Sequence, residues 1–134
     1  MPAHLTLFHQ LPPSAEIEAV RRLAGFAALA PPRASVAGVM DLGEGTALRI
    51  ESADLEDIRA DLADAFCGLL TIQDQAPWRP HVTIQNKVEP REAKRLQAQL
   101  RATFQPRTLA IRGLALWRYL RGPWEPVQKW TFRG

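Results

Sequence analysis

The chain has 134 residues, a length that fits a single domain spanning 1–134 and that can bury a core without disulfides. Hydrophobic residues make up 46% and charged residues 23%, but no apolar run approaches the roughly 20 residues needed to cross a bilayer. With one cysteine and no signal-peptide pattern at the start, the sequence argues against a membrane protein or a disulfide scaffold, and we expect a cytoplasmic protein.

The net charge of +3 is unevenly distributed along the chain. Residues 1–67 carry 5 basic and 10 acidic side chains, whereas residues 68–134 carry 12 basic and 4 acidic ones. Fourteen of the 17 basic residues are arginine, whose planar guanidinium suits phosphate. The basic half is compatible with an anionic partner such as RNA, and equally with a solvated face that binds nothing.

Four elements are predicted in the first part of the chain. They are a strand at about Ala3–Leu11, a helix with an apolar stripe over Ile17–Ala27, and strands at about Ser35–Asp41 and Thr46–Glu51. Pro12-Pro13 and Pro31-Pro32 bound the helix, and Gly43-Glu44-Gly45 fits a hairpin turn between the two strands.

The second part predicts five more elements after the hairpin. They are a helix at about Asp54–Leu70, a strand at about His81–Val88, a helix from Pro90 to Phe104, and strands at about Thr108–Leu120 and Pro126–Phe132. Cys67 falls on the apolar side of the first of these helices, so we expect a buried thiol. The order β-α-β-β-α-β-α-β-β predicts an α+β domain with largely antiparallel sheets.

One local pattern occurs twice. His4-Leu5-Thr6-Leu7 opens the first predicted strand, and His81-Val82-Thr83-Ile84 opens the strand after the Pro-rich loop. Because strand side chains alternate between faces, each histidine shares a face with its threonine, and the aliphatic residues share the other face. A single His-x-Thr is common by chance, but this chain has three histidines and two of them lie in the same pattern. The repetition favours one shared site.

Two histidines with two threonines suit acid–base chemistry on a phosphate. A histidine titrates near neutral pH, so one ring can take a proton from the attacking oxygen while the other gives one to the leaving oxygen. Each threonine hydroxyl can donate a hydrogen bond to a non-bridging phosphate oxygen. A zinc site is the competing use of two histidines, but it normally needs three or four ligands, and no third ligand stands at a suitable spacing.

These motifs resemble those of a known family. Two His-x-Thr motifs on separate strands are typical of the two-histidine phosphoesterases, which include bacterial 2'-5' RNA ligases and cyclic phosphodiesterases. PAHLTLFHQLP resembles the first motif, RPHVTIQNKV resembles the second, and LALWRYLRGPWEPV is similar to a C-terminal strand pair of bacterial members. The resemblance extends over nearly the whole chain.

The resemblance implies a two-lobed LigT-like fold, in which two largely antiparallel sheets face a central cleft and helices pack outside. It implies that His4 and His81 are the acid–base pair and that Thr6 and Thr83 bind phosphate. The implied substrate is RNA or a nucleotide with a 2',3'-cyclic phosphate or a 2'-5' linkage. The implied chemistry needs no cofactor, neither metal nor ATP.

The chain departs from the family at its start, because members usually have a strand and a helix before the first motif. Three explanations stay open: a misassigned start, a truncated chain, or a reduced member of the family. In each case the first lobe of this chain would lack an edge strand and its covering helix. An exposed sheet edge is prone to pairing, so a homodimer is one expected way to cover it. A strand beginning at residue 3 is also expected to fray, which would affect the position of His4.

Six further residues are predicted to bind substrate. Phe8 is expected on the face of His4 and Thr6, and Gln85 on the face of His81 and Thr83. Trp78 and Trp124 are stacking candidates for a base, with Arg79 and Arg121 nearby, although packing of both tryptophans in the protein is an equally simple interpretation. His9 is expected to be a structural or surface residue.

Three functions remain open from the sequence. The leading one is an RNA-end phosphoesterase or ligase, because both His-x-Thr pairs are intact. The second is a module on the same fold that binds RNA or a nucleotide without turning it over. The third is a small-molecule cyclic phosphodiesterase, in which the tryptophans would face away from the cleft.

Overall fold

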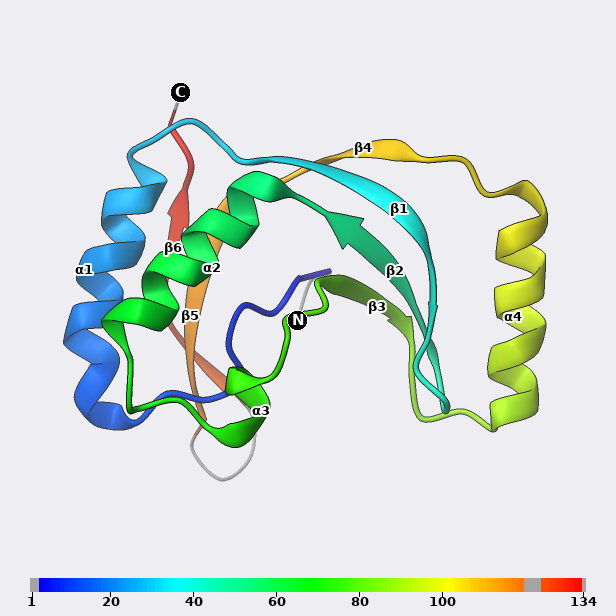
Figure 1. Cartoon of the computed structure of the whole chain (residues 1–134), viewed down its shortest axis with the longest axis horizontal. Coiled ribbons are helices and arrows are strands. Elements are labelled where there is room, and N and C mark those ends of the chain that lie inside the picture. Colours follow the sequence, from blue (N-terminus) through cyan, green and yellow to red (C-terminus); the bar gives the residue numbers. More distant parts are fainter. Residues whose placement is uncertain (1–2, 120–123, 134) are drawn as a thin grey trace.

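The computed structural model describes residues 3–119 and 124–133 as a mixed α+β fold with two antiparallel sheets (Figure 1). This architecture confirms the predicted fold class and is consistent with a LigT-like fold. The helices are α1 (Glu16–Ala27), α2 (Ala53–Ala65), α3 (Ile72–Gln75) and α4 (Pro90–Thr103), with a 3-10 turn, η1 (Pro13–Ala15), before α1. The strands are β1 (Arg33–Asp41), β2 (Thr46–Glu51), β3 (His81–Gln85), β4 (Arg107–Ala110), β5 (Gly113–Tyr119) and β6 (Trp124–Thr131).

The larger sheet has the order β3-β2-β1-β4, and it curls so that α4 lies on one side and α1 and α2 lie toward the other end of the molecule (Figure 1). Two bulges interrupt its register. Ala37 is the extra residue on β1, and Ile84 is the extra residue on β3. A bulge turns the following side chains relative to the partner strand, so these two positions decide which residues share a face.

The second sheet is the β5–β6 hairpin, which packs against α1. Its core joins both strands to α1 and α2, with Leu23, Leu62, Phe66, Leu114 and Phe132 buried together. The larger sheet has its own cluster, built on Ala34, Val36 and Ile50. Each sheet thus has its own hydrophobic cluster.

The first predicted strand, Ala3–Leu11, is wrong. The segment forms one isolated antiparallel bridge, between Leu5 and Val82, and has no continuous strand pairing. Leu7 and Phe8 both pack against the hydrophobic cluster of the β5–β6 sheet, although neighbours in a regular strand point to opposite faces. The segment is held by side chains of other elements instead of by a ladder of backbone hydrogen bonds.

Two other boundaries differ from the prediction. The second helix ends at Ala65 and not near Leu70, and Gly68 follows it with a φ of 85°. Cys67 is therefore exposed, contrary to the expected buried thiol. The predicted strand Thr108–Leu120 is two strands, because β4 pairs with β1 in one sheet and β5 pairs with β6 in the other.

The remaining predicted elements lie within a few residues of their expected bounds. Among residues 3–119 and 124–133, no helix combines the length and the apolar composition needed to cross a bilayer.

Candidate active site

The two His-x-Thr motifs meet at the bridge between Leu5 and Val82. Both bridge residues pack against the hydrophobic cluster of the larger sheet. In antiparallel register, the residues on either side of the bridge put His4 across from Thr83 and Thr6 across from His81, on the face away from that cluster.

This arrangement is locally symmetric, because each histidine faces the threonine of the other motif. The two histidines are then diagonal neighbours, and diagonal positions in an antiparallel pair lie roughly 7–8 Å apart. Such a spacing leaves room for a phosphate between two imidazoles. The face is open to solvent, since His4 and Thr83 are exposed and Thr6 and His81 are half-buried.

The ring of His81 is oriented by its own loop. Its Nδ1 lies 2.7 Å from the carbonyl oxygen of Arg79. A carbonyl oxygen only accepts, so Nδ1 carries the proton and donates it. The neutral ring therefore has its lone pair on Nε2, the atom that points away from this loop contact and can take or return a proton.

The first motif is anchored by Asp74, which lies in α3 and is 2% exposed. Its carboxylate accepts the backbone amide of His9 at 2.9 Å, the amide of Gln10 at 3.1 Å, and Nδ1 of His9 at 2.9 Å. Burial alone would raise the pKa of Asp74, but these hydrogen bonds outweigh it and the pKa lies below its ordinary value. The contact confirms that His9 has a structural role.

Arg59 and Trp78 hold the same segment from the other side. The guanidinium of Arg59, in α2, donates to the carbonyl of Leu7 at 2.9 Å and to that of Asp74 at 2.8 Å, and it lies 4.6 Å from the ring centroid of Phe8. The indole Nε1 of Trp78 donates to the carbonyl of Thr6 at 3.0 Å. The first motif is thus tied to the loop that leads into the second.

Several predicted substrate contacts have structural partners. Phe8 packs against the cluster of the β5–β6 sheet, and the guanidinium of Arg59 lies over its ring. Trp78 is half-buried. Its indole nitrogen donates to the carbonyl of Thr6, and the centroid of its ring lies 5.5 Å from the guanidinium carbon of Arg59. Arg79 is exposed and contributes its carbonyl to the ring of His81.

Gln85 does not share the face of His81 and Thr83, contrary to expectation. The bulge at Ile84 pairs Thr83 with Ala47 but Gln85 with Thr46, and these two neighbours on β2 point to opposite faces. The side-chain oxygen of Gln85 accepts the hydroxyl of Thr46 at 2.9 Å, next to α4. This contact fastens the end of β3 to the sheet.

Trp124 begins β6 opposite Tyr119, and the two ring centroids are 5.2 Å apart. Its side chain is 47% exposed, so a face remains accessible at this end of the hairpin. Arg121, predicted to lie beside it, falls outside the described residues.

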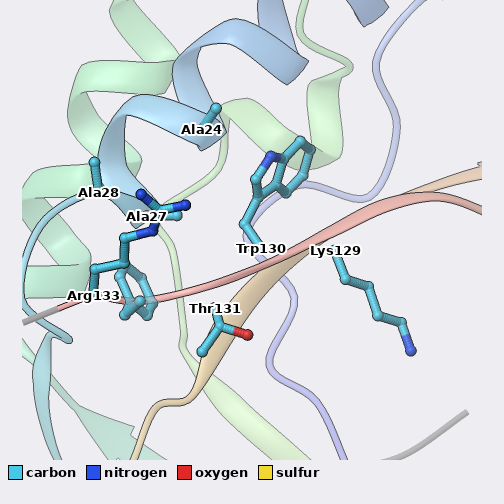
Figure 2. A pocket seen from close by; sticks show the side chains of 8 residues that line it. Ala24, Ala27, Ala28, Lys129, Trp130, Thr131 and Arg133 are labelled. Atoms are coloured by element: carbon cyan, nitrogen blue, oxygen red, sulfur yellow. The ribbon is translucent and has the colours of Figure 1, made fainter.

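A separate groove lies between the end of α1 and β6, lined by small residues of the helix together with Lys129, Trp130 and Arg133 (Figure 2). It contains none of the predicted site residues. In the described ranges, 3–119 and 124–133, no group of three or more His, Cys, Asp or Glu side chains gathers as metal ligands do.

The sequence did not single out Asp74 or Arg59. Each is one of many charged residues on a helix, and its partners in the segment of the first motif lie 52 to 65 residues away in the chain. The sequence held one weak indication that Asp74 has a specific role, since it is the one acidic residue between Leu70 and Val88.

Comparison with known proteins identifies the family of the chain. A search of the curated proteins finds no significant match. The family model of the 2'-5' RNA ligase superfamily matches residues 1–123, which include both motifs and all but the last strand. This match is consistent with the two-histidine phosphoesterases that the motifs resemble, and it supports an enzymatic function of phosphoesterase or ligase type. The chain therefore belongs to the 2'-5' RNA ligase superfamily.

Proposed function

We propose that this chain is a metal-independent phosphoesterase that acts on RNA ends, opening 2',3'-cyclic phosphates or making and breaking 2'-5' linkages. The observation that carries the proposal is the Leu5–Val82 bridge, because it brings the two His-x-Thr motifs side by side in antiparallel directions. A phosphate held between them meets a histidine from each side.

In the hydrolytic direction, one imidazole takes a proton from a water molecule as its oxygen attacks phosphorus. The bond from phosphorus to the 2' or 3' oxygen breaks, and the second imidazole gives that oxygen a proton. The product is a phosphate monoester beside a free hydroxyl. Thr6 and Thr83 donate hydrogen bonds to the non-bridging oxygens, whose charge grows in the transition state.

His81 has the local geometry that this role requires. The hydrogen bond from Nδ1 to the Arg79 carbonyl fixes the ring and leaves Nε2 as the proton-transfer atom. The hydrogen bond from Trp78 to the Thr6 carbonyl and the Arg59 bond to Leu7 hold the first motif against it. Preorganisation of this kind lowers the cost of reaching the reactive geometry.

The test is turnover of a nucleoside 2',3'-cyclic phosphate, and of an oligonucleotide with the same end, in the presence of EDTA. We expect His4→Ala and His81→Ala each to reduce kcat by roughly 10²–10⁴-fold, the usual contribution of a general acid or base. Circular dichroism and a thermal melt of each variant serve as the control for folding. Turnover that survives both substitutions, or that requires added metal, would contradict the proposal.

A binding module on the same fold is the alternative outcome of this assay. In that case the protein would bind the oligonucleotide with no turnover, and the histidine variants would bind as the parent does. Two matched histidines argue against this outcome, because binding alone has no need of two proton-transfer groups.

A further inference from the structure

The motif face of the larger sheet continues beyond the two motifs. Thr6 lies across from His81, His81 pairs with Arg49 on β2, and Arg49 pairs with Gly38 on β1. Directly opposed residues in antiparallel strands share a face. Arg49 therefore lies in the same row as the second histidine, on the open side of the sheet.

The guanidinium of Arg49 is held in place over β1. Its Nη2 donates to the carbonyl of Ala37 at 3.1 Å, and its Nη1 contacts Oε1 of Glu51 at 2.7 Å. Ala37 is the bulged residue, so its carbonyl is a point where the regular pairing is interrupted. A side chain at Gly38 would meet the guanidinium, since a Cβ there would lie 3.3 Å from Nε and from Nη2. The glycine thus leaves the space in which the cation lies.

Binding of an anionic ligand to Arg49 loses little free energy, because the ion pair that it replaces is weak. Arg49 and Glu51 have side chains 45% and 64% exposed, and an exposed ion pair contributes at most about 1 kcal/mol. A phosphate offers the guanidinium a bidentate contact in its place.

The position of the cation suits a second phosphate and not the reacting one. It lies over β1, two strand spacings or roughly 10 Å from β3, which carries His81. That distance is of the order of one nucleotide in an extended strand. A groove of about 370 Å³ beside the cation is lined by Arg49, Glu51, Glu56, Trp78 and Arg79, among others, which is room for a nucleoside next to Arg49.

We propose that Arg49 binds the phosphate next to the one held by the two His-x-Thr motifs, so that the preferred substrate is an oligonucleotide end and not a mononucleotide. The inference rests on the proposed function and names its substrate class. It separates the RNA-end enzyme from the small-molecule cyclic phosphodiesterase, because a mononucleoside cyclic phosphate has no second phosphate to offer.

The experiment compares two substrates that differ in that phosphate: a nucleoside 2',3'-cyclic phosphate and a dinucleotide that ends in the same group. We expect Arg49→Gln to raise KM for the dinucleotide about tenfold and to leave kcat/KM for the mononucleotide within twofold. The dependence of log KM on log salt should weaken by about 0.7–1 for the dinucleotide alone. Arg95→Gln, which removes one exposed charge from α4, is the matched control and should change neither substrate.

Two neighbouring variants test the same contact without removing the arginine. Glu51→Gln releases the guanidinium and removes a negative charge from the path of the phosphate, so KM for the dinucleotide should fall. Gly38→Ala pushes the guanidinium aside and should raise KM for the dinucleotide, but by less than Arg49→Gln does. The order Glu51→Gln, parent, Gly38→Ala, Arg49→Gln in increasing KM is the expected result.

An equal loss on both substrates, or no loss on either, would overturn the role of Arg49. If the parent turns over neither substrate, the proposed function fails, and the inference is still decided by equilibrium binding. Fluorescence polarisation of a labelled dinucleotide with a 3'-phosphate against the labelled mononucleotide must then show the same selective loss in Arg49→Gln. Binding that is insensitive to Arg49 would reject the second-phosphate site.

Discussion

The two His-x-Thr motifs have nearly the same sequence but are supported in different ways. His81 and Thr83 lie on β3, which is paired with β2 over several residues. His4 and Thr6 lie in a segment with a single backbone bridge, held by the carboxylate of Asp74, the guanidinium of Arg59 and the indole of Trp78. A functional group can therefore be positioned by a strand ladder or by a few side chains that satisfy an irregular backbone.

The difference matters because a single substitution should disturb the two kinds of support to different extents. A strand ladder shares its hydrogen bonds among many residues, whereas the first motif depends on three side chains from other elements. Single substitutions should therefore loosen His4 and Thr6 while His81 and Thr83 stay in place. Each of the following predictions tests this asymmetry.

The largest effect is expected for Asp74→Ala. It leaves the part-buried amides of His9 and Gln10 without their acceptor, and hydrogen bonds to a charged group contribute about 1.5–3 kcal/mol each. We expect the free energy of unfolding to fall by about 3 kcal/mol and kcat for cyclic phosphate to fall with it. Denaturant unfolding and hydrogen exchange measure the effect, with loss of protection in residues 5–11 and little change in β3.

Asp61→Ala is the matched control, since it removes an exposed carboxylate from α2. It should change the free energy of unfolding by less than about 0.5 kcal/mol. Equal loss of protection in β3 and in the first motif of Asp74→Ala would show that the two motifs share one support.

A smaller effect is expected for Trp78→Phe, which keeps an aromatic ring but removes the N–H that binds the Thr6 carbonyl. One neutral hydrogen bond contributes about 1 kcal/mol. We expect kcat/KM for the cyclic phosphate to fall about fivefold with circular dichroism unchanged. Trp117→Phe on β5 is the control. A Trp78→Phe variant with parental kcat/KM would show that Thr6 is positioned without this bond.

The smallest effect is expected from lowering the pH. The folded pKa of Asp74 lies below its ordinary value of about 3.9, so its contacts stabilise the first motif above that pH and are lost as the pH falls through the folded pKa. Hydrogen exchange of the His9 and Gln10 amides should accelerate below about pH 4, before the amides of β3 do. Simultaneous loss of protection in both regions would contradict the separate support of the first motif.

Much of the fold follows from local pattern. Helical spacing of apolar residues located α1 and α4, and proline and glycine breaks located β1 and β2, because these signals act within one element. The doubled motif was also visible in the sequence, and the structure sets its two copies side by side. The catalytic roles assigned to His4, Thr6, His81 and Thr83 remain predictions that the proposed assay decides.

The missed features depend on contacts between distant residues. Residues 108–120 alternate like one strand, and only the pairing of β4 with β1 and of β5 with β6 divides them. The residue types at Ala37 and Ile84 do not indicate a bulge. The bulge at Ile84 nevertheless turns Gln85 away from the motif face, and the carbonyl of the bulged Ala37 accepts a hydrogen bond from Arg49. Asp74 was missed for the same reason, because its role depends on hydrogen bonds from backbone amides that lie 64 and 65 residues away in the chain.

The two-residue link between β4 and β5 has a mechanical consequence. The chain leaves one sheet at Ala110 and enters the other at Gly113, and within the described residues Ile111 packs against the hydrophobic clusters of both lobes. The side chain of Ile111 therefore couples the packing of one hydrophobic cluster to that of the other. A smaller residue at this position would leave a void against both clusters at once and loosen the junction of the two sheets.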